Sequence, residues 1–194
     1  MSKATGPVYR VPFRRRRDSL TNYARRLALV KSGRPRMVVR KSLRGVCVQF
    51  LKFTDKGDMV LAGANSNELK KLGWSQRGNL PTAYLTGALA AKRAGAKGVD
   101  AFVLDIGLST ASKNALPFGA AKGALDAGLK TGLDPATVDA ARIRGEHIAK
   151  YAVLLKGTKK YEAMFADYIK EGMQPEKLPE RFDAVKEKVL KGGA

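Results

Sequence analysis

The first 52 residues carry a density of positive charge that cannot be buried in a folded core. They contain fifteen basic side chains and one acidic side chain, Asp18, which gives a net charge of +14 out of +20 for the whole chain. Charges of one sign repel one another in a compact state unless a polyanion offsets them. The remaining 142 residues hold 22 basic and 16 acidic side chains, the mixture of an ordinary globular surface. We therefore expect the first quarter of the chain to bind a polyanion and the rest to support it.

The composition argues against several other classes of protein. The chain is 44% hydrophobic over 194 residues, enough for the core of one domain. One cysteine excludes an intramolecular disulfide, and a single histidine beside it argues against a zinc cluster. No apolar run approaches the roughly 18 residues of a membrane span, and no apolar signal-peptide segment follows the basic start. We expect a soluble, cytoplasmic protein with no cofactor, no metal, no membrane contact and no small-molecule substrate.

Arginine dominates the basic quarter. Arginine pairs with phosphate through two hydrogen bonds and stacks on bases, whereas lysine acts more as a point charge. Tyr9, Phe13 and Tyr23 are interleaved with the arginines, and this mixture favours structured RNA over duplex DNA as the partner. A sorting signal or a solvated arm without a specific partner is the alternative. The arginines are Arg10, Arg14, Arg15, Arg16, Arg17, Arg25, Arg26, Arg34, Arg36, Arg40 and Arg44.

The pattern of the N-terminal part predicts an arm followed by a helix. Glycine and prolines in residues 1–12 predict an extended arm. Apolar residues recur at three- and four-residue spacing from Leu20 to Val30, which predicts one amphipathic helix over 14–31. We expect its apolar stripe to dock on the body and its arginines to face outward.

The rest of the chain predicts an α/β fold with mixed connectivity. Strands are expected at 36–41, 46–54 and 59–64, joined as a meander, and the apolar run 99–106 predicts a central strand covered on both faces. The capping box at Asn65 predicts a short helix ending at Gly73. Further helices are expected at 80–94, from Pro117 to about Gly128, from Pro135, and at 146–155, 158–171 and 179–191.

These elements predict one three-layer domain with a mixed sheet. We divide the chain into a basic arm and helix at 1–35, a globular domain at 36–144, and a helical C-terminal extension at 145–194, which wraps on the body or on a neighbour. Small residues at 87–91 would allow the 80–94 helix to lie close to the sheet. The glycines at 119, 123 and 128 do not form a phosphate-binding motif, and their spacing suits tight helix packing.

The sharpest catalytic alternative is a metal-dependent nuclease. Asp105, late in the predicted central strand, would hold magnesium with partners among Asp100, Asp126 and Glu146. No pair of acids stands on the meander strands to complete such a site, so we do not expect an enzyme. His147 and Cys47 are more simply structural, and Trp74 either stacks on a base or packs under the following loop. A general nucleic-acid-packaging protein is the other alternative.

Several segments resemble a known family. They are residues 6–17 (GPVYRVPFRRRR), 21–29 (TNYARRLAL), 32–36 (SGRPR), 39–42 (VRKS), 79–87 (NLPTAYLTG), 105–108 (DIGL) and 144–151 (RGEHIAKY). Together they resemble the archaeal and eukaryotic form of large-subunit ribosomal protein L-eighteen, over nearly the whole chain. The three-layer fold implied by the resemblance is similar to the ribonuclease-H-like architecture, although the family is not catalytic.

The resemblance implies a component of the large ribosomal subunit that binds 5S ribosomal RNA. It would attach that RNA to the subunit in the central protuberance, contact the large ribosomal RNA, and meet neighbouring ribosomal proteins through the C-terminal extension. The arm and the sheet face carry the family's RNA contacts. Arg44 is added here for its charge and position alone. The candidate RNA-binding residues are Tyr9, Arg10, Arg14, Arg15, Arg16, Arg17, Tyr23, Arg25, Arg26, Arg34, Arg36, Arg40, Lys41, Ser42 and Arg44.

Overall fold

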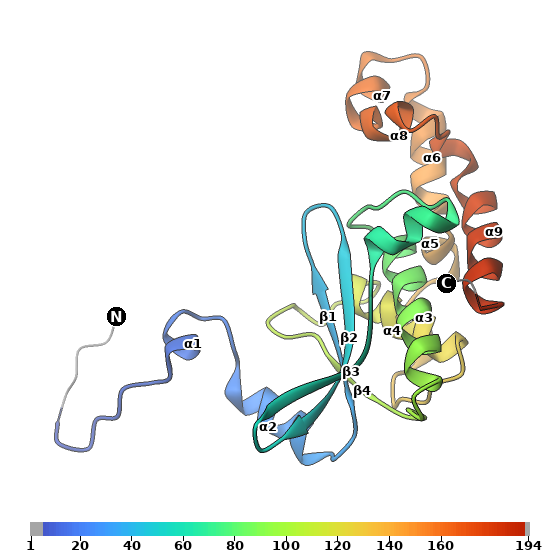
Figure 1. Ribbon diagram of the computed structural model, residues 1–194. Coiled ribbons are helices and arrows are strands. Elements are labelled where there is room, and N and C mark those ends of the chain that lie inside the picture. The colour runs from blue at the N-terminus through green and yellow to red at the C-terminus, as the bar shows by residue number, and fades with distance from the viewer. Residues whose placement is uncertain (1–5, 193–194) are drawn as a thin grey trace.

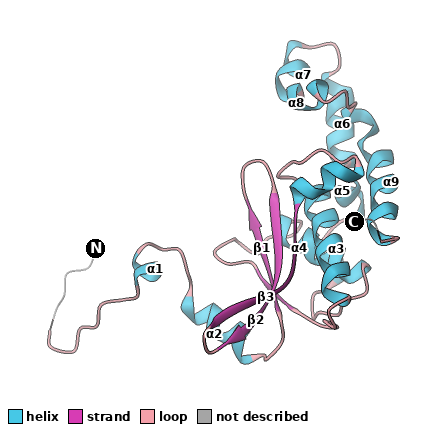
Figure 2. Ribbon diagram, in the orientation of Figure 1, coloured by secondary structure: helices cyan, strands magenta, loops and turns pink. Residues whose placement is uncertain are grey.

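A mixed β-sheet forms the centre of the computed structural model, which describes residues 6–192 (Figures 1 and 2). Its strands are β1 (Arg36–Lys41), β2 (Val46–Thr54), β3 (Gly57–Asn65) and β4 (Val103–Asp105). Within the described residues the strand order is β3-β2-β1-β4, with β1 antiparallel to β2, β2 antiparallel to β3, and β4 parallel to β1. The predicted meander and the mixed α/β fold are confirmed. Residues 1–5 of the predicted arm, including Lys3, lie outside the described part.

The prediction for β4 was wrong. The run 99–106 predicted a long central strand, whereas only three of its residues form β4, at one edge of the sheet and half-buried. The residues before β4 pair with another part of the chain: the Phe102 N–H donates to the Lys130 carbonyl at 2.9 Å. Val99 and Phe102 are apolar because they fill the core, with 5% and 0% exposure, and their burial does not require a long sheet ladder.

Two helices cover one face of the sheet, α3 (Leu80–Gly95) and α4 (Leu116–Asp126) (Figure 1). Alternate strand side chains point to them, and Met37, Val48 and Phe50 are fully buried there. The opposite face carries Arg36, Val38 and Arg40 of β1. Its cover is thin and comes from α2 at one end.

The predicted helix over 14–31 is two helices, α1 (Arg14–Arg17) and α2 (Tyr23–Lys31). The chain breaks between them because Ser19 adopts a positive φ of 52° and Asn22 caps α2, accepting from the Arg25 N–H at 3.1 Å. The apolar stripe docks less deeply than expected. No residue of α2 is buried, and Leu27 is 55% exposed.

The contact between α3 and α4 is a close approach of two backbones. A Cβ atom built at Gly87 would collide with the backbone of Ala120, and one built at Gly123 would collide with the carbonyl of Tyr84. The spacing of the α4 glycines was therefore interpreted correctly. Gly87 was expected to permit packing on the sheet and instead permits packing on α4.

The C-terminal half of the chain is helical, and its apolar side chains pack into the same hydrophobic core as those of the sheet. Trp74 and Tyr84 contact Phe182, with ring centroids 6.1 and 5.4 Å away. Trp74 is 3% exposed and its Nε1–H donates to Thr82 Oγ1 at 2.9 Å, so its role is packing. The remaining helices are α5 (Ala140–Arg144), α6 (Glu146–Leu155), α7 (Lys159–Met164), α8 (Ala166–Lys170) and α9 (Leu178–Leu190), with 3-10 turns η1 (Ser66–Leu72), η2 (Pro135–Thr137) and η3 (Pro175–Lys177).

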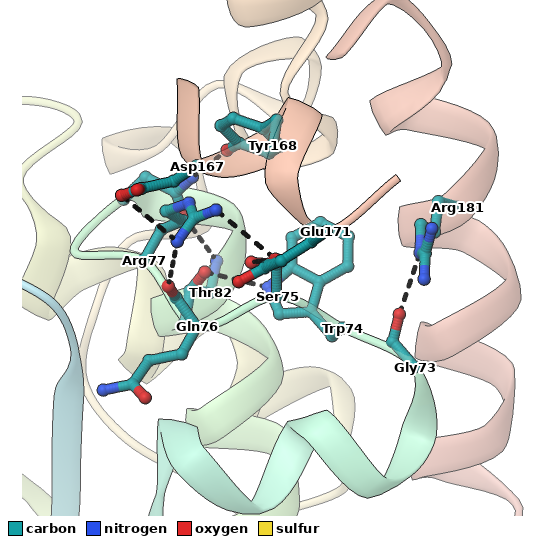
Figure 3. A network of polar contacts seen from close by, with 11 residues as sticks. Gly73, Trp74, Ser75, Gln76, Arg77, Thr82, Asp167, Tyr168, Glu171 and Arg181 are labelled. Atoms are coloured by element: carbon teal, nitrogen blue, oxygen red, sulfur yellow. Dashed lines mark hydrogen bonds and ion pairs between the residues drawn. The ribbon is translucent and has the colours of Figure 1, made fainter. Parts of the chain in front are cut away.

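Polar contacts fasten this half to the loop that precedes α3 (Figure 3). The Arg181 Nε–H donates to the Gly73 carbonyl at 2.8 Å, and Ser75 donates to Glu171. The Arg77 guanidinium lies 3.4 Å from a Glu171 oxygen and 4.6 Å from the Tyr168 ring centroid. The extension therefore wraps on the body, one of the two arrangements that the sequence left open. The predicted helix over 158–171 divides at Phe165, which is buried.

The close helix contact gives a stability prediction. Replacing Gly87 with alanine should lower the free energy of unfolding by about 1–3 kcal/mol, because α3 and α4 must move apart. Gly95→Ala on the same helix is the matched control, since a Cβ there lies 4.0 Å from the nearest atom of Leu129. That variant should be unchanged or more stable by up to about 1 kcal/mol. Urea denaturation measures both, and equal stabilities would contradict the close approach of the two backbones.

Candidate nucleic-acid interface

A basic groove runs between α2, the sheet and the loop that joins β4 to α4. Its volume is about 960 Å³, and one wall is α2 while the other is residues 106–117. The floor is formed by the open face of β1 with contributions from Leu51 and Asp58. The arginines and lysine that line it are Arg15, Arg25, Arg26, Arg36, Arg40 and Lys41. Six of the fifteen basic side chains of the first 52 residues therefore line one concave surface.

The wall formed by α2 presents arginine because of its local fold. Asn22 fixes the start of the helix, which leaves Arg25 exposed and Arg26 half-buried beside the sheet. Tyr23 in the first turn contacts Phe13 of the arm, with ring centroids 5.3 Å apart. This aromatic contact joins the arm to the α2 wall. The Phe13 ring therefore already packs on Tyr23 in the absence of RNA.

The arginines of α1 lie outside the groove proper, apart from Arg15. All four side chains of Arg14–Arg17 are exposed, and within the described residues none forms an ion pair. The Arg15 Nε–H donates to Thr21 Oγ1 at 2.9 Å, which turns that side chain toward the groove. Figure 1 shows α1 and the arm projecting away from the helices that cover the other face of the sheet. Arg10 and Arg34 are likewise exposed.

The far end of β1 carries the next group of candidate residues. Arg40 and Lys41 are exposed, although their neighbour Val39 is buried. A tight turn follows, in which the Ser42 N–H donates to the Gly45 carbonyl at 2.8 Å and the Ser42 hydroxyl donates to the same oxygen at 3.1 Å. The turn leaves Arg44 projecting into solvent.

Arg36 differs from the other candidates because it is buried. Its side chain is 4% exposed, and its guanidinium lies 2.6 Å from Asp58 Oδ1 and 3.1 Å from Asp105 Oδ2. A guanidinium held by two carboxylates inside the fold is committed to the protein's own structure. From the sequence Arg36 was expected to bind RNA like its neighbours, since alternation along β1 does not reveal which side chains a helix covers.

The second wall could not be predicted from charge. It consists of small polar residues after β4, including Ser109, Thr110 and Ser112, with the Asp105 carboxylate accepting from the Gly107 N–H at 2.9 Å. Hydroxyl groups of this kind bind phosphate and sugar oxygens, as charged residues do, and so help to position a nucleic acid. In the sequence, only the cluster of hydroxyl residues after Asp105 could have indicated that this loop forms a wall of the groove.

Three of the four carboxylates considered for a metal site are engaged by different partners. Asp105 pairs with Arg36, Asp126 accepts from the Tyr84 hydroxyl at 2.6 Å, and Glu146 lies 3.4 Å from Arg144. Burial and the Asp126 carboxylate raise the pKa of Tyr84, so its hydroxyl keeps its proton and remains a donor. Within residues 6–192 no three histidine, cysteine or acidic side chains gather as metal ligands.

The lone cysteine and histidine show the environments of structural residues. Partial burial raises the pKa of Cys47, so its thiol is protonated at neutral pH. Desolvation of the ring by neighbouring atoms, together with nearby Arg142, lowers the pKa of His147, although most of this residue of α6 is exposed. Among the described residues no helix is long and apolar enough to cross a membrane.

The mixed α/β body, with an arginine-rich groove and arm on one side, defines a polyanion-binding class of protein. Residues 8–100 match the family model described as "Ribosomal large subunit proteins 60S L5, and 50S L18". The chain is 50% identical over 190 residues to the large ribosomal subunit protein uL18 of Thermofilum pendens, covering 96% of this chain and 97% of that one. It is 48% identical over 191 residues to the same protein of Ignicoccus hospitalis, covering 96% and 94%. The chain belongs to the uL18 family of large-subunit ribosomal proteins.

The burial of Arg36 leads to a second stability prediction. Arg36→Met should lower the free energy of unfolding by about 2–4 kcal/mol, because it leaves Asp105 without its cation and Asp58 with Arg26 alone. Arg40→Met, four residues along the same strand and exposed, should change it by no more than about 0.5 kcal/mol. Urea denaturation of the RNA-free protein measures both. Similar destabilisation of the two variants would show that Arg36 has no special structural role.

Proposed function

We propose that this protein binds 5S ribosomal RNA and attaches it to the large ribosomal RNA in the central protuberance of the large subunit. The observation that carries the proposal is a groove lined by the exposed Arg15, Arg25 and Arg40, with the other exposed arginines of α1 outside it. The family membership supports a structural role in the large subunit, and the groove supplies the surface. Two structured RNA segments fit an interface made of a concave groove and a projecting arm.

Binding in this proposal is electrostatic with readout of RNA shape. Arg25, Arg40 and Lys41 would neutralise phosphates that enter the groove, and hydroxyls of the second wall would bind sugar and phosphate oxygens. Tyr9, which is 38% exposed, is placed to stack on an unpaired base, a contact worth roughly 1–3 kcal/mol. Binding involves no bond breaking, and the protein acts as a scaffold.

The C-terminal extension provides the proposed contacts with neighbouring ribosomal proteins. Its outer surface exposes apolar side chains that the core does not cover, with Leu154 at 78%, Val153 at 60% and Met164 at 60%. Exposed apolar groups in such proximity mark a protein contact more often than an RNA contact. The two ends of the molecule would then have different partners.

The arginines of α1 give the sharpest test of RNA binding. Replacing Arg14–Arg17 with glutamine should weaken binding to 5S ribosomal RNA, because fewer phosphates are neutralised. The slope of log affinity against log salt concentration should fall by about 0.7–0.9 for each phosphate that the variant no longer neutralises. Filter binding or fluorescence anisotropy over a range of salt concentrations measures this slope.

The matched control removes the same charge elsewhere. Four exposed lysines of the C-terminal helices, Lys159, Lys160, Lys170 and Lys188, are replaced with glutamine. The control should retain most of the affinity and nearly the full salt slope. Equal weakening in the two variants would mean that only net charge matters. Tight binding of duplex DNA by the wild-type protein would favour a general packaging role instead.

A further inference from the structure

Four alternating charges cross the floor of the groove in a chain. Arg26 on α2 lies 2.8 Å from Asp58 Oδ2, and the other oxygen of Asp58 lies 2.6 Å from Arg36. Arg36 in turn lies 3.1 Å from Asp105. The side chains become less exposed toward the middle, from 36% at Arg26 and 22% at Asp58 to 4% at Arg36.

This chain of charges joins both walls of the groove to the sheet. Arg26 belongs to the α2 wall, and Asp58 stands at the start of β3. At the other end, Asp105 uses its second oxygen to accept from the Gly107 N–H of the loop wall at 2.9 Å. The central member, Arg36, is a residue of β1 and hence of the floor.

The packing of α2 is shallow. No residue of the helix is fully buried and Leu27 is 55% exposed, although Tyr23, Leu29 and Val30 are half-buried. The Arg26–Asp58 pair adds a direct polar bond between the helix and the sheet. A half-buried ion pair is stronger than one on an open surface, because solvent screens it less.

We propose that Asp58 and Arg26 are positioning residues that set the distance between α2 and β1, and so the width of the RNA-binding groove. The inference rests on the proposed RNA-binding function and adds residues that act without touching RNA. Asp58 fixes Arg26, and Arg26 fixes the helix from which Arg25 faces the groove. In this proposal Arg26 mainly pairs with Asp58 within the protein, whereas the sequence suggested that it mainly binds RNA.

The sign of the effect separates this proposal from simple electrostatics. Asp58 is an acid in a groove that would take phosphates, so its charge alone opposes RNA binding. Neutralising it should tighten RNA binding if only net charge matters. If Asp58 positions α2, the same neutralisation should weaken binding, because the helix is no longer attached to the sheet.

The experiment compares Asp58→Asn with Asp55→Asn in the full-length protein. Asp55 lies in the same β2–β3 hairpin turn, is exposed, and forms no ion pair within the described residues. Binding of 5S ribosomal RNA is measured by fluorescence anisotropy at one salt concentration. We expect Asp55→Asn to bind as tightly as the wild type or more tightly, and Asp58→Asn to bind about three- to tenfold more weakly. Asp58→Glu, which keeps the carboxylate, should restore much of the affinity.

A second measurement follows the helix directly. Hydrogen exchange of the α2 amides in the RNA-free protein should become faster in Asp58→Asn, while exchange in α3 stays slow. Should Asp58→Asn fail to fold, Arg26→Gln gives the same test with Arg36 still paired to both carboxylates. Arg26→Gln should accelerate α2 exchange, and its neighbour Arg25→Gln, which removes the same charge, should not.

The outcomes distinguish the two claims. Tighter RNA binding by Asp58→Asn, or α2 exchange in Arg26→Gln as slow as in the wild type, would overturn the positioning role. In that case weaker binding by Arg25→Gln would still support the groove as the RNA site. A wild-type protein that binds 5S ribosomal RNA no better than an unrelated folded RNA would overturn the proposed function itself.

Discussion

The paired, buried guanidinium of Arg36 is the interaction on which the groove side of the structure depends. Removing a charge from water is costly, and the cost is met only where partners of opposite charge stand close on more than one side. The meander supplies Asp58 and the edge strand supplies Asp105, so a correct pair of contacts requires β1, β3 and β4 to be in register. The same three strands contribute side chains to the groove, and β4 leads directly into its loop wall.

The distribution of charge over the surface follows from this arrangement. The acids near the groove, Asp58 and Asp105, are already taken by Arg36, so most of the exposed arginines around them find no internal partner. In the rest of the chain some basic groups find acids, as Arg77 does with Glu171 and Arg144 does with Asp183 at 2.6 Å. The difference between the two parts is one of balance: residues 1–52 hold fifteen basic side chains and one acid, whereas the rest holds 22 basic side chains and 16 acids. The N-terminal part is therefore the stronger attractor for a polyanion.

Local signals in the sequence predicted the elements that local interactions control. The capping box of Asn65 and Glu68 and the left-handed Gly73 bound η1 as expected, and the meander and α3 follow their patterns closely. The predictions that failed depended on distant parts of the chain. Periodicity alone continued the helix through Ser19, and an apolar run suggested a central strand where the residues instead fill the core. The charge of the N-terminal part predicted a basic site. Only the folded structure shows that Arg36 is buried while arginines near it in the chain are exposed, and that the loop after Asp105 lies opposite α2.

An arm and a groove contribute differently to recognition of a structured RNA. An exposed arm of arginines gains affinity by releasing counterions, and this gain is much the same for any RNA of similar charge density. A groove discriminates only if its walls keep a fixed separation, since a groove that adjusts its width accepts many shapes. Because no residue of α2 is fully buried, a directional polar contact adds rigidity to that wall, and Arg26 with Asp58 supplies one. On the proposed function, the few acids on this face would then matter to RNA selection as well as the many arginines, although their charge alone opposes RNA binding.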